Sequence, residues 1–131
     1  MKKIPLPFRA ASLAVGLALG TPAGADQTFD AHLATARHNL ATEAGAAYDL
    51  ALGQAVEKVP AVTQAMTACL RKHPGNHALQ GYFHFTAPAA YTVMLAPAGP
   101  FAACLSKALE GQPLPAPPGV PYFNHFTFTV Q

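Results

Sequence analysis

The chain has 131 residues, and eight Lys and Arg against six Asp and Glu give it a formal charge of +2. Hydrophobic residues make up 51% of it and charged residues 11%, a composition that excludes a disordered chain and fits one small domain. The sequence has no uninterrupted apolar run of about 20 residues, which argues against a permanent membrane span.

Residues 1–25 have the three parts of a bacterial secretory signal. A basic opening, Met1–Arg9, precedes the apolar run Ala10–Gly20, and Ala23-Gly24-Ala25 forms an A-x-A cleavage site. An uncleaved anchor is the alternative, for which the apolar run is short. We therefore predict a signal peptide over 1–25 and a single mature domain over 26–131, located in the periplasm or secreted.

Cleavage changes the charge of the chain. It removes Lys2, Lys3 and Arg9, which leaves five basic and six acidic residues and a formal charge of −1. Only Arg71 and Lys72 are adjacent, whereas binding to phosphates needs clustered basic residues. The sequence therefore disfavours nucleic acid and a polybasic membrane contact as partners.

The mature chain has two cysteines, Cys69 and Cys104, with 34 residues between them. An exported protein meets an oxidising environment, where disulfides persist. A redox pair is the alternative, but the C-x-x-C spacing that usually lowers a thiol pKa is missing. We predict a structural bridge, which in the chain-entropy model stabilises the fold by up to about 4 kcal/mol.

The first half of the mature chain has helical periodicity. Apolar residues recur at helical spacing from Phe29 to Leu40 and again from Tyr48 to Val59, with Thr42 as an N-cap between the two runs. These runs define a helical N-terminal part over 26–61. A third helix begins at Pro60, a favoured first position, and stops before His73-Pro74-Gly75-Asn76.

The second half changes to strand periodicity. Tyr82–Thr86 and Tyr91–Leu95 predict an antiparallel hairpin, and a helix from Pro100 ends at Gly111. A proline-rich connector, Gln112–Pro121, leads to a last strand over Tyr122–Val130. On that strand Phe126, Phe128 and Val130 share one face, and His125, Thr127 and Thr129 share the other. The order of elements predicts an α+β fold, with N-terminal helices followed by a β-β-α-β unit.

Residues 62–131 resemble the TonB C-terminal-like modules that carry a cysteine pair. The matching features are Cys69 at a helix end, the strand Gly81–Phe85, Cys104 in the next helix and the closing strand His125–Phe128. The resemblance implies a periplasmic contact module whose final strand, here Tyr122–Val130, is an exposed edge. That edge would pair with an extended segment of a partner, with His125, Thr127 and Thr129 as partner-binding residues.

The motifs of catalysis are missing. Ser106, the only serine of the mature chain, lies in a predicted helix without a nucleophile elbow, and there is no glycine-rich phosphate loop. No carboxylate is placed beside a histidine in a loop in a way that suggests acid–base work. We therefore expect neither an enzyme nor a cofactor.

The histidines leave a second hypothesis open. Six histidines remain in the mature chain, and His84 and His125 lie on strands that could be neighbours. With His77 they would form a copper or zinc site, although surface and helix-end histidines are the plainer interpretation. We expect an exported, non-enzymatic domain that contacts another envelope or secreted protein, possibly by strand addition at its C-terminal strand. A histidine-dependent metal-binding protein is the alternative.

Overall fold

The computed structural model describes residues 27–131. The predicted signal peptide over 1–25 lies outside the described residues, and so does residue 26. The chain divides into two compact units, Met1–Ala31 and His32–Gln131. The boundary falls within a first helix, described over residues 27–40. A single domain over 26–131 stays a prediction.

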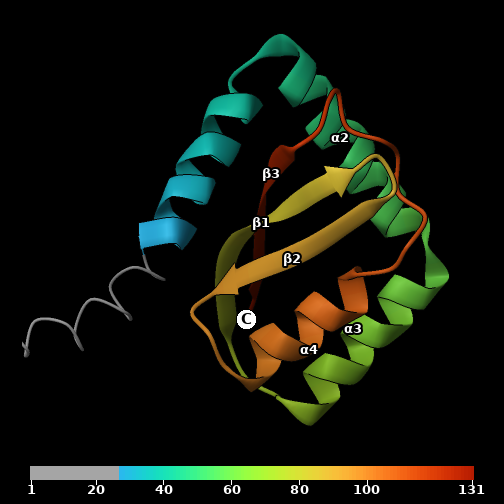
Figure 1. Ribbon diagram of the computed structural model, residues 1–131. Coiled ribbons are helices and arrows are strands. Elements are labelled where there is room, and N and C mark those ends of the chain that lie inside the picture. The colour runs from blue at the N-terminus through green and yellow to red at the C-terminus, as the bar shows by residue number, and fades with distance from the viewer. Residues whose placement is uncertain (1–26) are drawn as a thin grey trace, which may run out of the picture. The chain divides into compact units, whose positions relative to one another are not determined.

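Helices α2 (Glu43–Lys58) and α3 (Pro60–Lys72) begin at the predicted signals (Figure 1). The hydroxyl of Thr42 accepts a hydrogen bond from the N–H of Gly45 at 3.0 Å, which satisfies one of the free donors of the first turn of α2. Pro60 opens α3, because a missing N–H is harmless at the first helical position.

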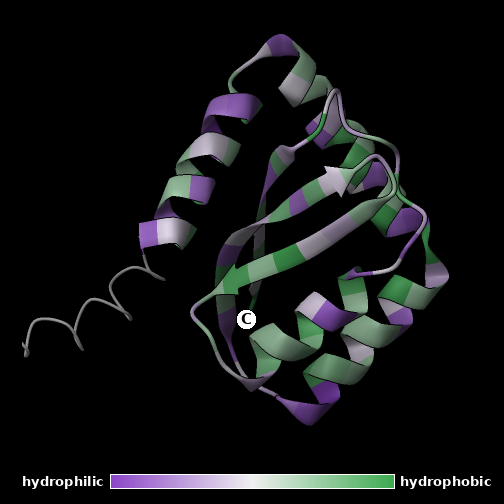
Figure 2. Cartoon of the chain, in the orientation of Figure 1, coloured by the Kyte–Doolittle hydropathy of each residue, from purple (hydrophilic) through white to green (hydrophobic). Residues whose placement is uncertain are grey.

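Helix α4 (Pro100–Leu109) is more apolar than α2 and α3 and is coloured mostly as hydrophobic in Figure 2. It buries Phe101, Ala102, Leu105 and Leu109. Gly111 follows its end with φ of 76°, a left-handed conformation that suits glycine. The predicted stop is therefore confirmed.

Three antiparallel strands form one sheet in the order β2-β1-β3. They are β1 (His77–Ala87), β2 (Ala90–Ala96) and β3 (Tyr122–Val130). The predicted hairpin and last strand are confirmed, but β1 begins earlier than Tyr82 because its first residues pair with the end of β3, from His77 opposite Val130. Strand β3 is an edge of this sheet.

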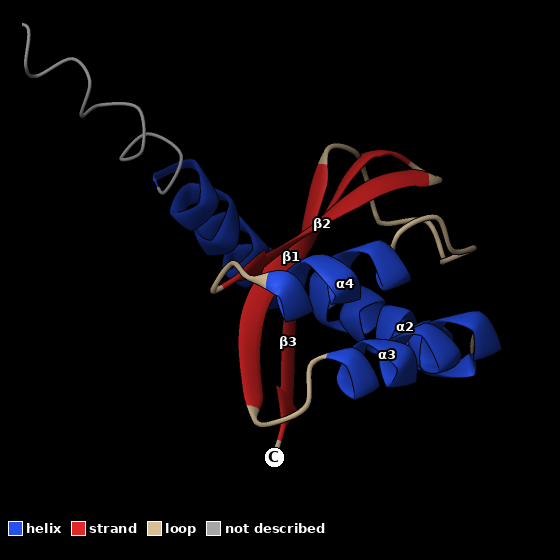
Figure 3. Ribbon diagram, turned by 90° about the horizontal axis from the view of Figure 1, so that it is seen from below, coloured by secondary structure: helices blue, strands red, loops and turns tan. Residues whose placement is uncertain are grey.

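The sheet of the second unit is covered on both faces. Helices α2, α3 and α4 lie together on one face (Figure 3), where Phe83 and Phe85 of β1 are buried in one core with Leu105 and Leu109. On the other face, Arg37 of the first helix donates a hydrogen bond to Gln80 of β1 at 2.8 Å. The predicted α+β class is confirmed.

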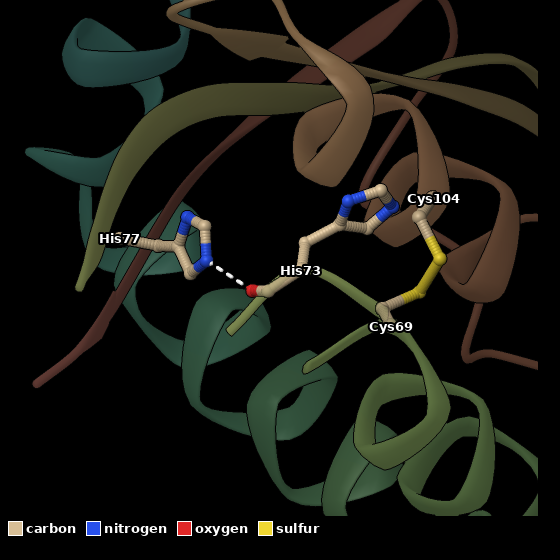
Figure 4. Close-up of a disulfide and its surroundings, with 4 residues drawn as sticks. All are labelled: Cys69, His73, His77 and Cys104. Atoms are coloured by element: carbon tan, nitrogen blue, oxygen red, sulfur yellow. Dashed lines mark hydrogen bonds between the residues drawn. A yellow bond between two sulfur atoms is a disulfide. The ribbon is translucent and has the colours of Figure 1, made fainter. Parts of the chain in front are cut away.

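The predicted disulfide joins Cys69 of α3 to Cys104 of α4, with the two Cα atoms 5.8 Å apart (Figure 4). The side chain of Cys69 is buried. The bridge therefore clamps α3 to the helix that fills the core. None of the helices within residues 27–131 combines the length and the apolar character that a membrane crossing requires.

Candidate functional site: a half-open sheet edge beside an apolar groove

The carbonyls on the outer edge of β3 are covered by side chains over its first half, which we call the closed half. The side-chain amide of Asn39, from the first helix, donates a hydrogen bond to the carbonyl of Phe123 at 3.0 Å. The side-chain amide of Asn124 donates one to the carbonyl of His125 at 3.1 Å. Both carbonyls therefore point away from β1 and are satisfied by side chains.

The second half of the same edge is open. In an antiparallel ladder the N–H and C=O of every second residue point to the same side, so the groups of Thr127 and Thr129 also point away from β1. Both residues are exposed, and no hydrogen bond of these outward groups occurs within residues 27–131. The edge thus offers four backbone hydrogen-bonding groups to solvent.

The other sheet edge differs near its middle. The backbone N–H of Val93 in β2 donates to Oε2 of Glu110, just past α4, at 2.9 Å. A carboxylate at this place covers an outward donor of β2 and brings negative charge to the edge, which is one way in which proteins block strand addition. The open half of β3, by contrast, reads Thr-Phe-Thr-Val and has no charged residue.

Two adjoining hollows lie beside β3, on the face of the sheet that α2 and α3 cover. Their volumes are about 460 Å³ and 300 Å³, and they share Val56, Glu57, Met66 and Phe128. Leu52 and Phe126 line the larger one, and Leu70 lines the smaller one. We call the two hollows together the β3 groove.

The lining of the β3 groove is largely apolar, with neutral polar residues such as Asn124 and Thr127, and its charged side chains are acidic. Asp49 and Glu57, both from α2, are its only lining residues with a full charge, and no Lys or Arg lines it. Neither carboxylate takes part in an ion pair within residues 27–131, and Asp49 accepts a hydrogen bond from Asn124 at 3.0 Å. The groove therefore carries uncompensated negative charge.

His125 sits at the border between the closed and open halves of the edge. Its Nε2 is buried and has no hydrogen-bond partner among the described residues. Burial lowers the pKa of His125 and nearby Arg37 lowers it further, whereas Asp49 acts in the opposite direction. The lowered pKa favours the neutral imidazole of His125.

The predicted partner-binding residues, His125, Thr127 and Thr129, all lie on β3, as the alternation of side chains in the sequence predicted. Thr127 and Thr129 stand at the open half, and His125 stands beside it. The sequence reasoning missed Asn39, Asn124, Asp49 and Glu57. No local signal marks these four, because their role arises from contacts between segments far apart in the chain.

The three histidines of the alternative metal site are not brought together. His77 and His84 differ by an odd number of positions on β1, so their side chains leave opposite faces of the sheet. The ring of His77 stacks on Phe101 at 3.9 Å, and its Nε2 is 2.6 Å from the carbonyl oxygen of His73 (Figure 4). His84 instead stacks on Phe123 at 4.3 Å.

No cluster of three or more His, Cys, Asp or Glu side chains suited to a metal ion occurs in residues 27–131. The structure does not bring His77, His84 and His125 together at one site. The physical reason is the two-residue period of a strand, which the sequence argument did not apply to His77.

No protein-family model matches the chain, and neither a curated protein nor a solved structure matches it. The resemblance to TonB C-terminal-like modules therefore stays a prediction. The function has to be argued from the geometry of the β3 edge and groove.

Proposed function

We propose that the protein is an exported, non-enzymatic domain that binds another envelope or secreted protein by strand addition. An extended segment of the partner would pair with β3 at Thr127 and Thr129 and become the fourth strand of the sheet. The observation that carries this proposal is that the backbone N–H and C=O of Thr127 and Thr129 point away from β1 without a partner among the described residues. They do so next to the β3 groove.

Two physical arguments support the proposal. An added strand gains affinity from main-chain hydrogen bonds and gains specificity from pockets that receive every second side chain. The β3 groove lies on the side of the edge where those side chains would point. Natural proteins also tend to protect an open edge with charges, proline or a bulge, and the open half of β3 has none of these.

The location outside the cytoplasm is part of the same proposal. A disulfide between two helices is typical of oxidising compartments, and residues 1–25 have the pattern of a secretory signal. The resemblance of residues 62–131 to TonB C-terminal-like modules favours the same kind of contact.

The test is selection of displayed random peptides on the oxidised protein, followed by affinity measurements with two variants. Thr127→Pro removes an outward N–H, which an edge strand tolerates, so the fold should survive and can be checked by circular dichroism. Thr127→Val changes the side chain and keeps the backbone donor. Selected peptides should bind the wild type and Thr127→Val alike and lose at least about tenfold in affinity for Thr127→Pro, the equivalent of one or two hydrogen bonds.

Amide hydrogen exchange provides a second measurement on the same peptides. Bound peptide should slow exchange at Thr127 and Thr129, since both N–H groups become paired. Equal affinity for all three proteins, or unchanged exchange at both amides, would contradict strand addition.

A further inference from the structure

We infer that the segment added to β3 carries a large apolar side chain and, two residues along, a Lys or Arg that pairs with Glu57. This inference rests on the proposed strand addition and names the chemistry of the partner. It follows from the arrangement of α2 alongside β3 and from the charge of the groove.

Helix α2 and strand β3 run side by side over matching lengths. Asp49 is bonded to Asn124 in the larger hollow, and Glu57 lies with Phe128 where the two hollows meet. Eight residues of helix from Asp49 to Glu57 span about 12 Å. Four residues of strand from Asn124 to Phe128 span about 13 Å. Every second side chain of an added strand would point into the β3 groove, and we call these the inward positions. Successive inward side chains would therefore lie at successive points along α2.

The first inward position meets apolar walls. Leu52 and Val56 of α2, Met66 of α3 and Phe126 of β3 line the larger hollow. Its volume of about 460 Å³ is in the range of sites that bind small apolar groups. A side chain such as Val, Leu or Phe would bury its surface against these walls.

The next inward position meets negative charge. Glu57 is exposed, lines both hollows and has no ion-pair partner within residues 27–131. Asp49 adds a second negative charge further along the groove. A partner Lys or Arg is attracted to this place, and a partner Asp or Glu is repelled. Such charges discriminate between partners more than they add to affinity.

The same reasoning argues against a second copy of the chain as the occupant. Paired edge to edge, β3 of another copy would direct Phe126, Phe128 and Val130 inward and would offer no cation. The acidic groups would remain uncompensated in that pairing. The chemistry of the groove therefore favours a different protein with a basic, apolar segment.

The experiment uses synthetic peptides of about eight residues, long enough to cover the open half of β3 at about 3.3 Å per residue. All have Thr at outward positions. At the inward positions the first peptide alternates Val with Lys, the second alternates Val with Glu, and the third alternates Ala with Lys. Binding to the oxidised protein is measured by fluorescence anisotropy at low and at high salt.

The Val/Lys peptide should bind at least about fivefold more tightly than the Val/Glu peptide, the equivalent of about 1 kcal/mol. High salt should reduce this preference. Glu57→Gln should reduce it about two- to fivefold, the range expected for one exposed ion pair. Glu43→Gln should leave it unchanged, because Glu43 is an acid of the same helix that does not line the groove. The Ala/Lys peptide should bind more weakly than the Val/Lys peptide.

Three results would overturn the inference, and they differ in what they say about strand addition. Equal binding of the Val/Lys and Val/Glu peptides, with both lost in Thr127→Pro, would remove the cation and leave strand addition intact. Absence of Val/Lys binding up to millimolar concentration, or binding that Thr127→Pro does not affect, would count against both. A dimer in sedimentation velocity that dissociates in Thr127→Pro would assign the edge to a second copy.

Discussion

The side-chain amide of Asn124 on β3 donates hydrogen bonds to Oδ1 of Asp49 on α2, at 3.0 Å, and to the carbonyl of His125, at 3.1 Å. Asn124 is 4% exposed and is the only buried polar residue found among residues 27–131. One side chain thus ties α2 to the sheet and closes the edge of β3 at the point where the open half begins.

Replacing Asn124 should cost stability. In Asn124→Ala, Asp49 loses its donor and the carbonyl of His125 loses its partner, so we expect a loss of about 1–3 kcal/mol in the free energy of unfolding. Urea denaturation followed by circular dichroism measures the change. Asn76→Ala is the matched control, since Asn76 is exposed in the turn before β1. Equal midpoints for the two variants would show that the contact with Asp49 does not stabilise the fold.

Removal of the disulfide should also destabilise the protein. Cys69 and Cys104 are 35 positions apart in the sequence. In the chain-entropy model a loop of this size is worth up to about 4 kcal/mol, a large share of the stability of a small domain. The double variant Cys69→Ala/Cys104→Ala should therefore unfold at a much lower urea concentration than the oxidised wild type. The reduced wild type serves as the control and should behave like the variant. An unchanged midpoint in both would contradict this prediction.

Stability should fall as the pH is lowered through the range below 6.5, in part because of His84. Burial lowers the pKa of His84 from 6.5, and the neighbouring His32, whose ring centroid is 5.6 Å away, lowers it further. A histidine with a lowered pKa binds its proton more readily in the unfolded chain. Its contribution to stability is therefore present above pH 6.5 and is lost as the pH falls towards the folded pKa.

The measurement is the urea midpoint as a function of pH for the wild type and two variants. His84→Gln should have a flatter profile below pH 6.5, because one group that takes up a proton on unfolding is gone. Some slope should remain, since the pKa of His125 is lowered as well. His38→Gln, at an exposed position of the first helix, should follow the wild type. A profile of His84→Gln that coincides with the wild type would be the contrary result.

Two glycines should respond in opposite ways to alanine. A Cβ at Gly81 would overlap the carbonyl of Met94 on the neighbouring strand, so Gly81→Ala forces the β1–β2 backbones apart. Overpacking typically costs about 1–3 kcal/mol. A Cβ at Gly53 would meet nothing within 4 Å, and glycine inside a helix costs about 0.5–1 kcal/mol relative to alanine.

We therefore expect Gly81→Ala to lower the thermal midpoint and Gly53→Ala to raise it, both measured by calorimetry. Both variants replace glycine by alanine, so opposite changes in thermal midpoint would reflect the different surroundings of the two positions. A Gly81→Ala protein as stable as the wild type would show that β1 and β2 do not approach as closely as the structure places them.

The elements of this fold could be predicted because their signals are local. Thr42, Pro60 and Gly111 mark helix ends within a few residues, and the alternation of Phe126 and Phe128 with Thr127 and Thr129 marks a strand. The bridge between Cys69 and Cys104 also followed from the sequence, since two cysteines allow only one pairing. The early start of β1 did not follow, because residues 77–81 depend on β3 for their hydrogen bonds.

Sequence alone established the α+β class, the covalent link and the strand on which a partner is expected. Tertiary structure decided which half of that strand is open and what lies beside it. The hydrogen bond from Asn39 to the carbonyl of Phe123 joins residues 84 positions apart in the sequence. The hydrogen bond between Asn124 and Asp49 joins residues 75 positions apart. Caps and periodicity act over one or two turns of chain, whereas a groove between a helix and a sheet edge exists only once distant segments have packed against a common core.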